Sequence, residues 1–189
     1  MRTWIEHVGL EAAAGRLAEL YGRLKRRNGT LSNIWAAQSL RPHLIEGHVA
    51  FYRAALGHSA NKLPLWFLEA VGVQVSALNA CDYCVDHHRH FGGLAWKGDK
   101  AQWAAMTEAL IENRPETAFS DKELALLDYA RRLTLAPSTI EEEDIEALRE
   151  AGADDGEILE VNQVAAYFAY ANRTVLGLGV TLEGEKYDE

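Results

Sequence analysis

The sequence from Leu65 to His90 reads LWFLEAVGVQVSALNACDYCVDHHRH and joins a long apolar segment to a polar one that holds both cysteines of the chain. The apolar segment follows Pro64 and ends near Leu78. Its valines alternate as in a strand, but its length and the lack of a partner strand elsewhere favour a buried helix. Asn79 is suited to cap a second helix. We therefore predict that the cysteine motif lies at the start of a central helix.

The rest of the chain shows the same helical period. Helices are predicted over residues 11–27, 43–56, 124–135 and 157–176, with further helix starts at Asp99, Ser120 and Thr139. The sequence has no repeat and no low-complexity segment. The predicted fold class is all-α, with one domain over residues 1–189 and an acidic tail at about 183–189.

The composition is that of a globular protein with a sizeable core. Of the 189 residues 48% are hydrophobic and 25% charged, and 19 Lys and Arg against 28 Asp and Glu give a formal net charge of −9. This sign disfavours nucleic acid and anionic membranes as partners. Residues 1–10 contain no signal-peptide pattern, and polar residues interrupt the apolar stretches 65–80 and 161–180. We therefore expect no membrane span and a cytoplasmic location, where cysteines are usually reduced.

The polar segment contains a C-x-x-C motif followed by a histidine in helical phase. At about 100° per residue, Cys81, Cys84 and His88 fall within about 60° of one another on a helix. Two sulfurs spaced in this way reach disulfide distance with little backbone movement. A helix start at Asn79 lowers the pKa of Cys81, and a nearby imidazolium lowers that of Cys84. The pattern predicts a redox-active dithiol.

Glu69 is the carboxylate that best fits an acid–base role, because it lies inside an apolar stretch where burial without a partner is costly. One continuous helix leaves it about 18 Å from Cys81. If the chain turns back near Asn79 and Ala80, Glu69 lies level with His88 on the facing helix. The alternatives are an ion pair with a Lys or Arg and a solvent-facing side chain.

Three other interpretations of the motif remain open at this point. Cys81, Cys84 and His88 with one further ligand form a tetrahedral zinc set, although no further cysteine is present. A structural disulfide is disfavoured because it closes so short a loop. The third interpretation is two small buried residues at a helix start, with solvated histidines nearby.

The combination of Glu69, Cys81-x-x-Cys84 and His88 resembles the signature of the alkylhydroperoxidase D-like (AhpD-like) group of the carboxymuconolactone decarboxylase superfamily. The flanking sequences VSALN at 75–79, HH at 87–88, NR at 172–173 and GLGV at 177–180 resemble its peroxidase-related enzyme branch. The similarity extends from about Ile5 to Leu182. Two departures are Tyr83, where the best-known members have a histidine, and Leu68, where this branch often has an arginine.

The resemblance implies an all-helical fold and a thiol-dependent hydroperoxide reductase, or a dithiol adaptor for a peroxiredoxin. Cys84 is then the peroxidatic and Cys81 the resolving cysteine, with Glu69 and His88 as the proton relay. The expected partners are a small hydroperoxide and an external dithiol or protein disulfide reductant, with no cofactor and no metal. The alternatives are a lactone decarboxylase, whose members do not rely on a cysteine pair, and a non-catalytic zinc or assembly module.

The resemblance also implies a homo-oligomer, commonly a trimer or hexamer. The long last predicted helix points the same way, because its apolar residues cover more than one face. These residues are Val161, Val164, Tyr167, Phe168, Tyr170 and Val175.

Overall fold

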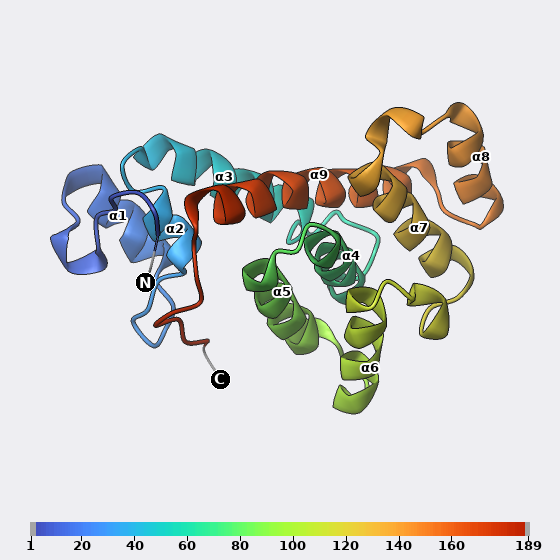
Figure 1. Ribbon diagram of the computed structural model, residues 1–189, viewed down its shortest axis with the longest axis horizontal. Coiled ribbons are helices and arrows are strands. Elements are labelled where there is room, and N and C mark those ends of the chain that lie inside the picture. Colours follow the sequence, from blue (N-terminus) through green and yellow to red (C-terminus); the bar gives the residue numbers. More distant parts are fainter. Residues whose placement is uncertain (1–2, 188–189) are drawn as a thin grey trace. The chain divides into compact units, whose positions relative to one another are not determined.

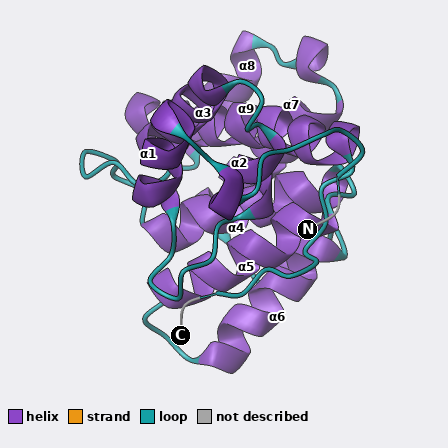
Figure 2. Ribbon diagram, turned by 90° about the vertical axis from the view of Figure 1, so that its left-hand side faces the viewer, coloured by secondary structure: helices purple, strands orange, loops and turns teal. Residues whose placement is uncertain are grey.

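The computed structural model describes residues 3–187 (Figure 1). Regular structure in this range is helical throughout, without a strand (Figure 2), which confirms the predicted all-α class. Three short 3-10 helices cover Leu10–Ala12, Pro115–Thr117 and Pro137–Thr139. The α-helices are α1 (Gly15–Leu24), α2 (Asn33–Ala37), α3 (Pro42–Ala55), α4 (Leu65–Leu78), α5 (Asp82–Ala95), α6 (Lys100–Ile111), α7 (Asp121–Leu135), α8 (Glu142–Glu150) and α9 (Asp155–Leu178).

The described chain divides into two compact units. Unit 1 comprises residues up to Tyr52 together with those from Arg173 onward, and unit 2 comprises Arg53–Asn172. The boundaries lie within α3 and α9. A single domain over residues 1–189 stays a prediction, and residues 188–189 of the predicted acidic tail lie outside the described residues. No helix within residues 3–187 combines the length and the apolar character needed to cross a membrane.

Unit 2 is built on the hairpin of α4 and α5, which lie side by side in Figures 1 and 2. Helix α4 is buried on nearly all sides, from Phe67 through Ser76, which confirms the buried helix predicted for this stretch. Helices α6 and α7 also pack against α4. The fully buried apolar core of unit 2 includes Phe67, Leu68, Val71, Leu110, Leu126, Leu127 and Phe168.

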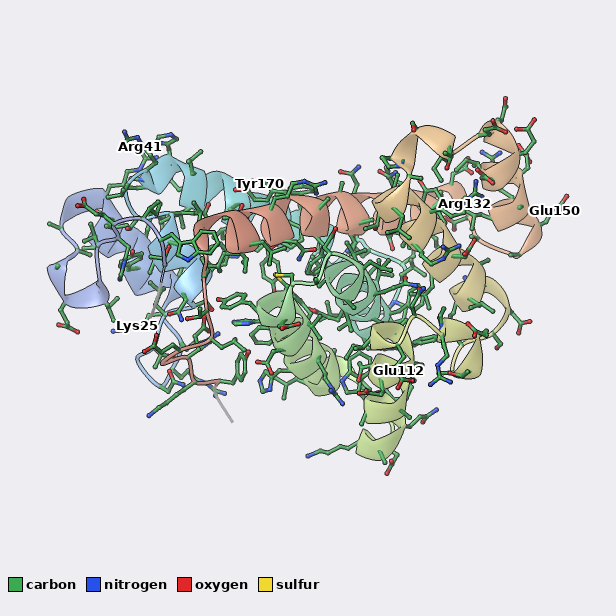
Figure 3. All side chains as sticks on the ribbon, in the orientation of Figure 1. Lys25, Arg41, Glu112, Arg132, Glu150 and Tyr170 are labelled. Carbon is green, nitrogen blue, oxygen red and sulfur yellow. The ribbon has the colours of Figure 1, made fainter. Side chains whose placement is uncertain are left out.

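Helix α9 packs against α4 at Gly72, the one glycine of α4. An ideal Cβ at Gly72 lies 2.3 Å from ring atoms of Phe168, so the absent side chain is what lets the aromatic ring of α9 approach. Elsewhere in unit 2, Arg132 of α7, which is labelled in Figure 3, forms an ion pair with Asp144 of α8.

Several helix ends differ from the prediction in instructive ways. Asp99 caps α6 as predicted, with its Oδ1 accepting from Ala101 N at 2.7 Å. Ser120 precedes α7 without a capping bond from its side chain, because Asp121 adopts a φ of 50°. Thr139 lies in a 3-10 turn that begins at Pro137, and α8 starts later. The predicted helix 11–27 is shortened because Gly15, at a φ of 53°, separates a 3-10 turn from α1.

Unit 1 contains a buried histidine in α3. His48 Nδ1 lies 2.8 Å from Gln38 Nε2, and its ring meets Trp35 edge-on with 4.7 Å between centroids. Since Gln38 Nε2 can only donate, His48 Nδ1 accepts and the imidazole is neutral. Burial lowers the pKa of His48 to about 4.

Candidate functional site

A tight turn between α4 and α5 presents the two cysteines. Cys81 N donates to Ser76 O at 2.9 Å and Ala80 N donates to Ala77 O at 2.9 Å, the bond pair that closes a Schellman turn. The turn requires a left-handed residue after the C-cap Asn79, and Ala80 takes that conformation with a φ of 55°. Glycine usually occupies this position, and alanine adopts it at a cost of about 1–2 kcal/mol.

The turn makes Cys81 the N-cap of α5, with Cys84 one turn later. Asn79, which the sequence indicated as this cap, instead ends α4. The two sulfur atoms lie 2.8 Å apart and both cysteines are free thiols. This separation is longer than a disulfide of about 2.05 Å, yet short enough that bond formation needs little movement.

The environment of the two sulfurs distinguishes them. The hydrogen bond between the two thiols and the backbone amide of Cys84 lower the pKa of the Cys81 thiol against the opposing effect of its burial. The same hydrogen bond raises the pKa of Cys84 far above its ordinary value, and burial adds to this. These contacts favour ionisation of Cys81 over that of Cys84, which is the direction expected from the helix N-terminus.

The α4–α5 hairpin also brings Glu69 and His88 together. Glu69 Oε2 lies 2.5 Å from His88 Nδ1, and both side chains are buried. The predicted turn near Asn79 and Ala80 is therefore correct, and Glu69 neither pairs with a Lys or Arg at this contact nor faces solvent. A carboxylate on Nδ1 sets the orientation of the ring and its tautomer. His88 follows Cys84 by one helical turn, so both side chains share a face of α5.

Aromatic packing fixes this imidazole. Phe168 of α9 meets the His88 ring edge-on with 4.4 Å between centroids. On the neighbouring turn, Gly92 allows Trp103 of α6 to approach: a Cβ at Gly92 lies 2.4 Å from the indole and 3.0 Å from Glu69 Cβ. The orientation of the Glu69–His88 pair therefore depends on the close packing of α4, α5, α6 and α9.

The neighbouring His87 is also buried, contrary to the interpretation in which the histidines are solvated. Its Nδ1 lies 3.0 Å from Tyr83 O and its ring stacks on Tyr83 with 4.3 Å between centroids. Tyr83, one of the two departures from the family pattern, thus packs against His87, the residue next to His88 in α5.

Asn172 of α9 is a site residue that the sequence analysis noted only as part of a flanking motif. Its side chain is 1% exposed. Its Nδ2 donates to Ser76 Oγ at 3.0 Å, and its Oδ1 accepts from Asn79 Nδ2 at 2.9 Å. It also lowers the pKa of both thiols by hydrogen bonding. Asn172 and its two partners are more than ninety positions apart, so no local sequence pattern links them. The one signal in the sequence is an asparagine within a largely apolar helix.

The donor arrangement bears on the zinc interpretation. Two cysteine sulfurs on one tetrahedral zinc lie about 3.8 Å apart, given a Zn–S distance of about 2.3 Å. Cys81 and Cys84 are closer, at 2.8 Å. Within residues 3–187, no three His, Cys, Asp or Glu side chains are grouped so as to hold a metal ion.

Comparisons with known proteins give matches among solved structures. No protein-family model and no curated protein matches the sequence. An alkylhydroperoxidase AhpD core structure, an uncharacterized peroxidase-related protein from Ralstonia eutropha JMP134, gives a TM-score of 0.82 at 22% identity, over 95% of this chain and 91% of that one. An uncharacterized peroxidase-related protein from Silicibacter sp. TM1040 gives 0.78 at 22% identity, over the same shares.

A third match is a protein with a different activity. The debrominase Bmp8, as a Cys-to-Ala variant in complex with 2,3,4-tribromopyrrole, gives a TM-score of 0.74 at 17% identity, over 97% of this chain and 94% of that one. Identities of this size establish the fold. The resemblance predicted from the sequence is confirmed at that level: the chain has the AhpD-like fold of these peroxidase-related proteins.

Proposed function

We propose that this protein is a thiol-dependent hydroperoxide reductase that uses the Cys81–Cys84 pair and the Glu69–His88 relay. The observation that carries the proposal is the pair of free thiols with 2.8 Å between sulfurs at the N-terminus of α5. A thiolate stabilised by a neighbouring thiol, a helix N-terminus and a nearby acid–base pair is the arrangement that peroxide chemistry requires. The substrate is a small hydroperoxide, and the reaction takes place in the cytoplasm.

The first step is the attack on the peroxide. Cys84 Sγ bonds to the distal oxygen of ROOH as the O–O bond breaks, and the Cys84 proton passes along the S–H···S contact to the Cys81 thiolate. His88, held by Glu69, holds the proton that Cys81 lost earlier and gives it to the departing alkoxide. The products are an alcohol and a Cys84 sulfenic acid.

The second step closes the disulfide. Cys81 Sγ displaces hydroxide from the sulfenic sulfur, and the thiol proton leaves with it as water. The two thiols have then supplied the two electrons that reduce ROOH to ROH and water. An external dithiol or protein disulfide reductant restores both thiols by exchange.

The proposal is tested by counting thiols before and after one equivalent of an organic hydroperoxide. We expect the loss of two thiols per chain, one equivalent of alcohol, and a Cys81–Cys84 link in the peptide mass map. Unchanged thiol and hydroperoxide concentrations would rule the proposal out. The flanking Tyr83→Phe variant is the matched control, because it leaves both sulfurs and the relay in place.

The roles of the two sulfurs are tested with single variants. A sulfenic acid trap should label Cys84 in the Cys81→Ser variant, while Cys84→Ser should abolish hydroperoxide turnover. If Cys84→Ser instead forms a sulfenic acid on Cys81 at the rate of the unaltered protein, the roles are reversed. The lower pKa of Cys81 makes that outcome a serious competitor.

Two further parts of the proposal concern assembly and a competing substrate. Helix α9 exposes Leu159, Tyr170 and Leu176, which supports self-association as a homo-oligomer, with size measured by light scattering. The debrominase with the same fold binds 2,3,4-tribromopyrrole in its crystal structure, so a brominated pyrrole belongs in the same thiol-count assay. Bromide release without hydroperoxide consumption would replace the proposed activity with dehalogenation.

A further inference from the structure

The turn that carries Cys81 is fastened to a helix distant in sequence through a single side chain. Asn172 Oδ1 accepts from Asn79 Nδ2, and Asn172 Nδ2 donates to Ser76 Oγ. Asn79 ends α4, and the Ser76 carbonyl accepts the backbone amide of Cys81. One asparagine therefore contacts both residues that set the position of the dithiol.

This fastening opposes the strain of the turn. Ala80 occupies the left-handed region with a φ of 55°. A non-glycine residue persists there when surrounding contacts determine its conformation. Both hydrogen bonds of Asn172 join it to residues that precede Ala80 in this turn, Ser76 and Asn79, and both are made by a side chain that is 1% exposed.

The same amide also favours the ionised form of both thiols. The side-chain amide of asparagine has two N–H donors, and Ser76 Oγ accepts only one of them. Asn172 lowers the pKa of Cys81 and of Cys84 by hydrogen bonding, which only an N–H donor can do for a thiolate. We propose that Asn172 is a positioning residue of the dithiol: it fastens the turn that bears Cys81 and holds an N–H donor beside the two sulfur atoms.

This inference deepens the proposed function and rests on the dithiol being its reactive centre. Besides the thiols, the titratable groups around the dithiol are Asp82 and His88 of α5 and Glu69 of α4. Asp82 opposes ionisation of Cys81. Asn172 of α9 carries no titratable group, so its own charge does not change over the pH range of the test.

The test is the rate of iodoacetamide alkylation of the reduced protein between pH 5 and 10, with each cysteine followed by mass spectrometry. Asn172→Asp keeps the shape of the side chain and its acceptor for Asn79, but replaces the N–H donor with a negative charge. We expect the midpoint of the pH profile to rise by about one unit and alkylation at pH 7 to fall about tenfold. Asn172→Ala should show a smaller change in the same direction, about threefold.

Asn162→Asp is the matched control. Asn162 also lies on α9 and donates from Nδ2, to Tyr129 Oη at 2.9 Å, but it has no bond to the α4–α5 turn. We expect its alkylation profile to equal that of the unaltered protein. If Asn172→Asp does not fold, Asn172→Ala decides the question, because it introduces no charge.

An unchanged midpoint in the folded Asn172 variants overturns the inference, and so does a rate that falls equally at every pH, which indicates a merely structural residue. The assay uses no hydroperoxide. A protein that consumes no hydroperoxide, yet shows the Asn172-dependent shift, therefore contradicts the proposed function and leaves this inference standing.

Discussion

Gly72 is the position of α4 at which one methyl group disturbs the candidate site. An ideal Cβ there lies 2.3 Å from Cε2 and from Cζ of Phe168. Carbon atoms in contact are about 3.5–4.0 Å apart. Phe168 is fully buried, and its ring packs edge-on against His88. Gly72→Ala therefore has to displace Phe168 by roughly 1 Å, which also moves the support of the imidazole.

Two effects of this substitution oppose each other. Replacing glycine with alanine inside a helix stabilises it by about 1 kcal/mol. Overpacking a filled core costs about 1–3 kcal/mol, and a displacement of this size in a fully buried ring belongs in the upper part of that range. We expect the clash to prevail and the free energy of unfolding to fall by about 1–2 kcal/mol.

Gly47 of α3 is the matched control, because a Cβ there meets nothing within 4 Å. Without a clash, only the higher helix propensity of alanine remains, so Gly47→Ala should raise the free energy of unfolding by about 0.5–1 kcal/mol. Urea unfolding followed by circular dichroism measures both variants. The reasoning is refuted if Gly72→Ala is as stable as the unaltered protein, or if Gly47→Ala loses as much stability as Gly72→Ala does.

Three further predictions concern buried polar groups. Gln74 is 0% exposed, and its Oε1 and Nε2 lack hydrogen-bond partners within residues 3–187. Gln74→Met should therefore raise the free energy of unfolding, measured by urea titration, by about 1–2 kcal/mol. A destabilised variant contradicts this prediction. The pKa of His48 is about 4 in the folded chain and about 6.5 in the unfolded chain. As the pH drops, the unfolded chain therefore binds the proton first and the folded state loses stability. From pH 7 to pH 5 the free energy of unfolding should fall by about 2 kcal/mol. Urea midpoints at the two pH values should show this loss, and His48→Asn should largely remove it. Glu69→Gln should lower hydroperoxide turnover near neutral pH about a hundredfold, and an unchanged pH–rate profile excludes Glu69 from the relay.

Local sequence patterns were sufficient for the all-helical class, for most of the longer helices and for one half of the site. Pro64 and the apolar run after it predicted α4, and the C-x-x-C spacing predicted that the two sulfurs meet. The pairing of Glu69 with His88 followed from helical geometry once the chain was allowed to turn back at Ala80. These inferences succeed because they depend on residue spacing within one hairpin.

The rest of the site depends on contacts that spacing does not encode. Alanine is a poor residue for a left-handed turn, so Ala80 gave no signal of the Schellman turn, and Asn79 was assigned to the wrong helix. Asn172 reaches the site from α9, and nothing in its neighbourhood in the sequence specifies what it bonds. The sequence did indicate a lowered pKa for Cys81 from a nearby helix start, but not the contacts that make Cys81 itself the N-cap.

Three unfavourable local features of unit 2 lie at the dithiol and the Glu69–His88 pair. Ala80 has a strained backbone, Glu69 is a buried carboxylate, and Cys84 is a thiol whose ionisation is opposed. A sequence selected for stability alone has glycine in such a turn and an apolar side chain in place of a buried acid. Each feature is instead held by a specific contact from another helix or turn: Asn172 at the turn, His88 at the carboxylate and Cys81 at the thiol. Departures from local preference that are compensated at one place are characteristic of a site maintained for chemistry, and they make this turn the place where single substitutions should separate activity from stability.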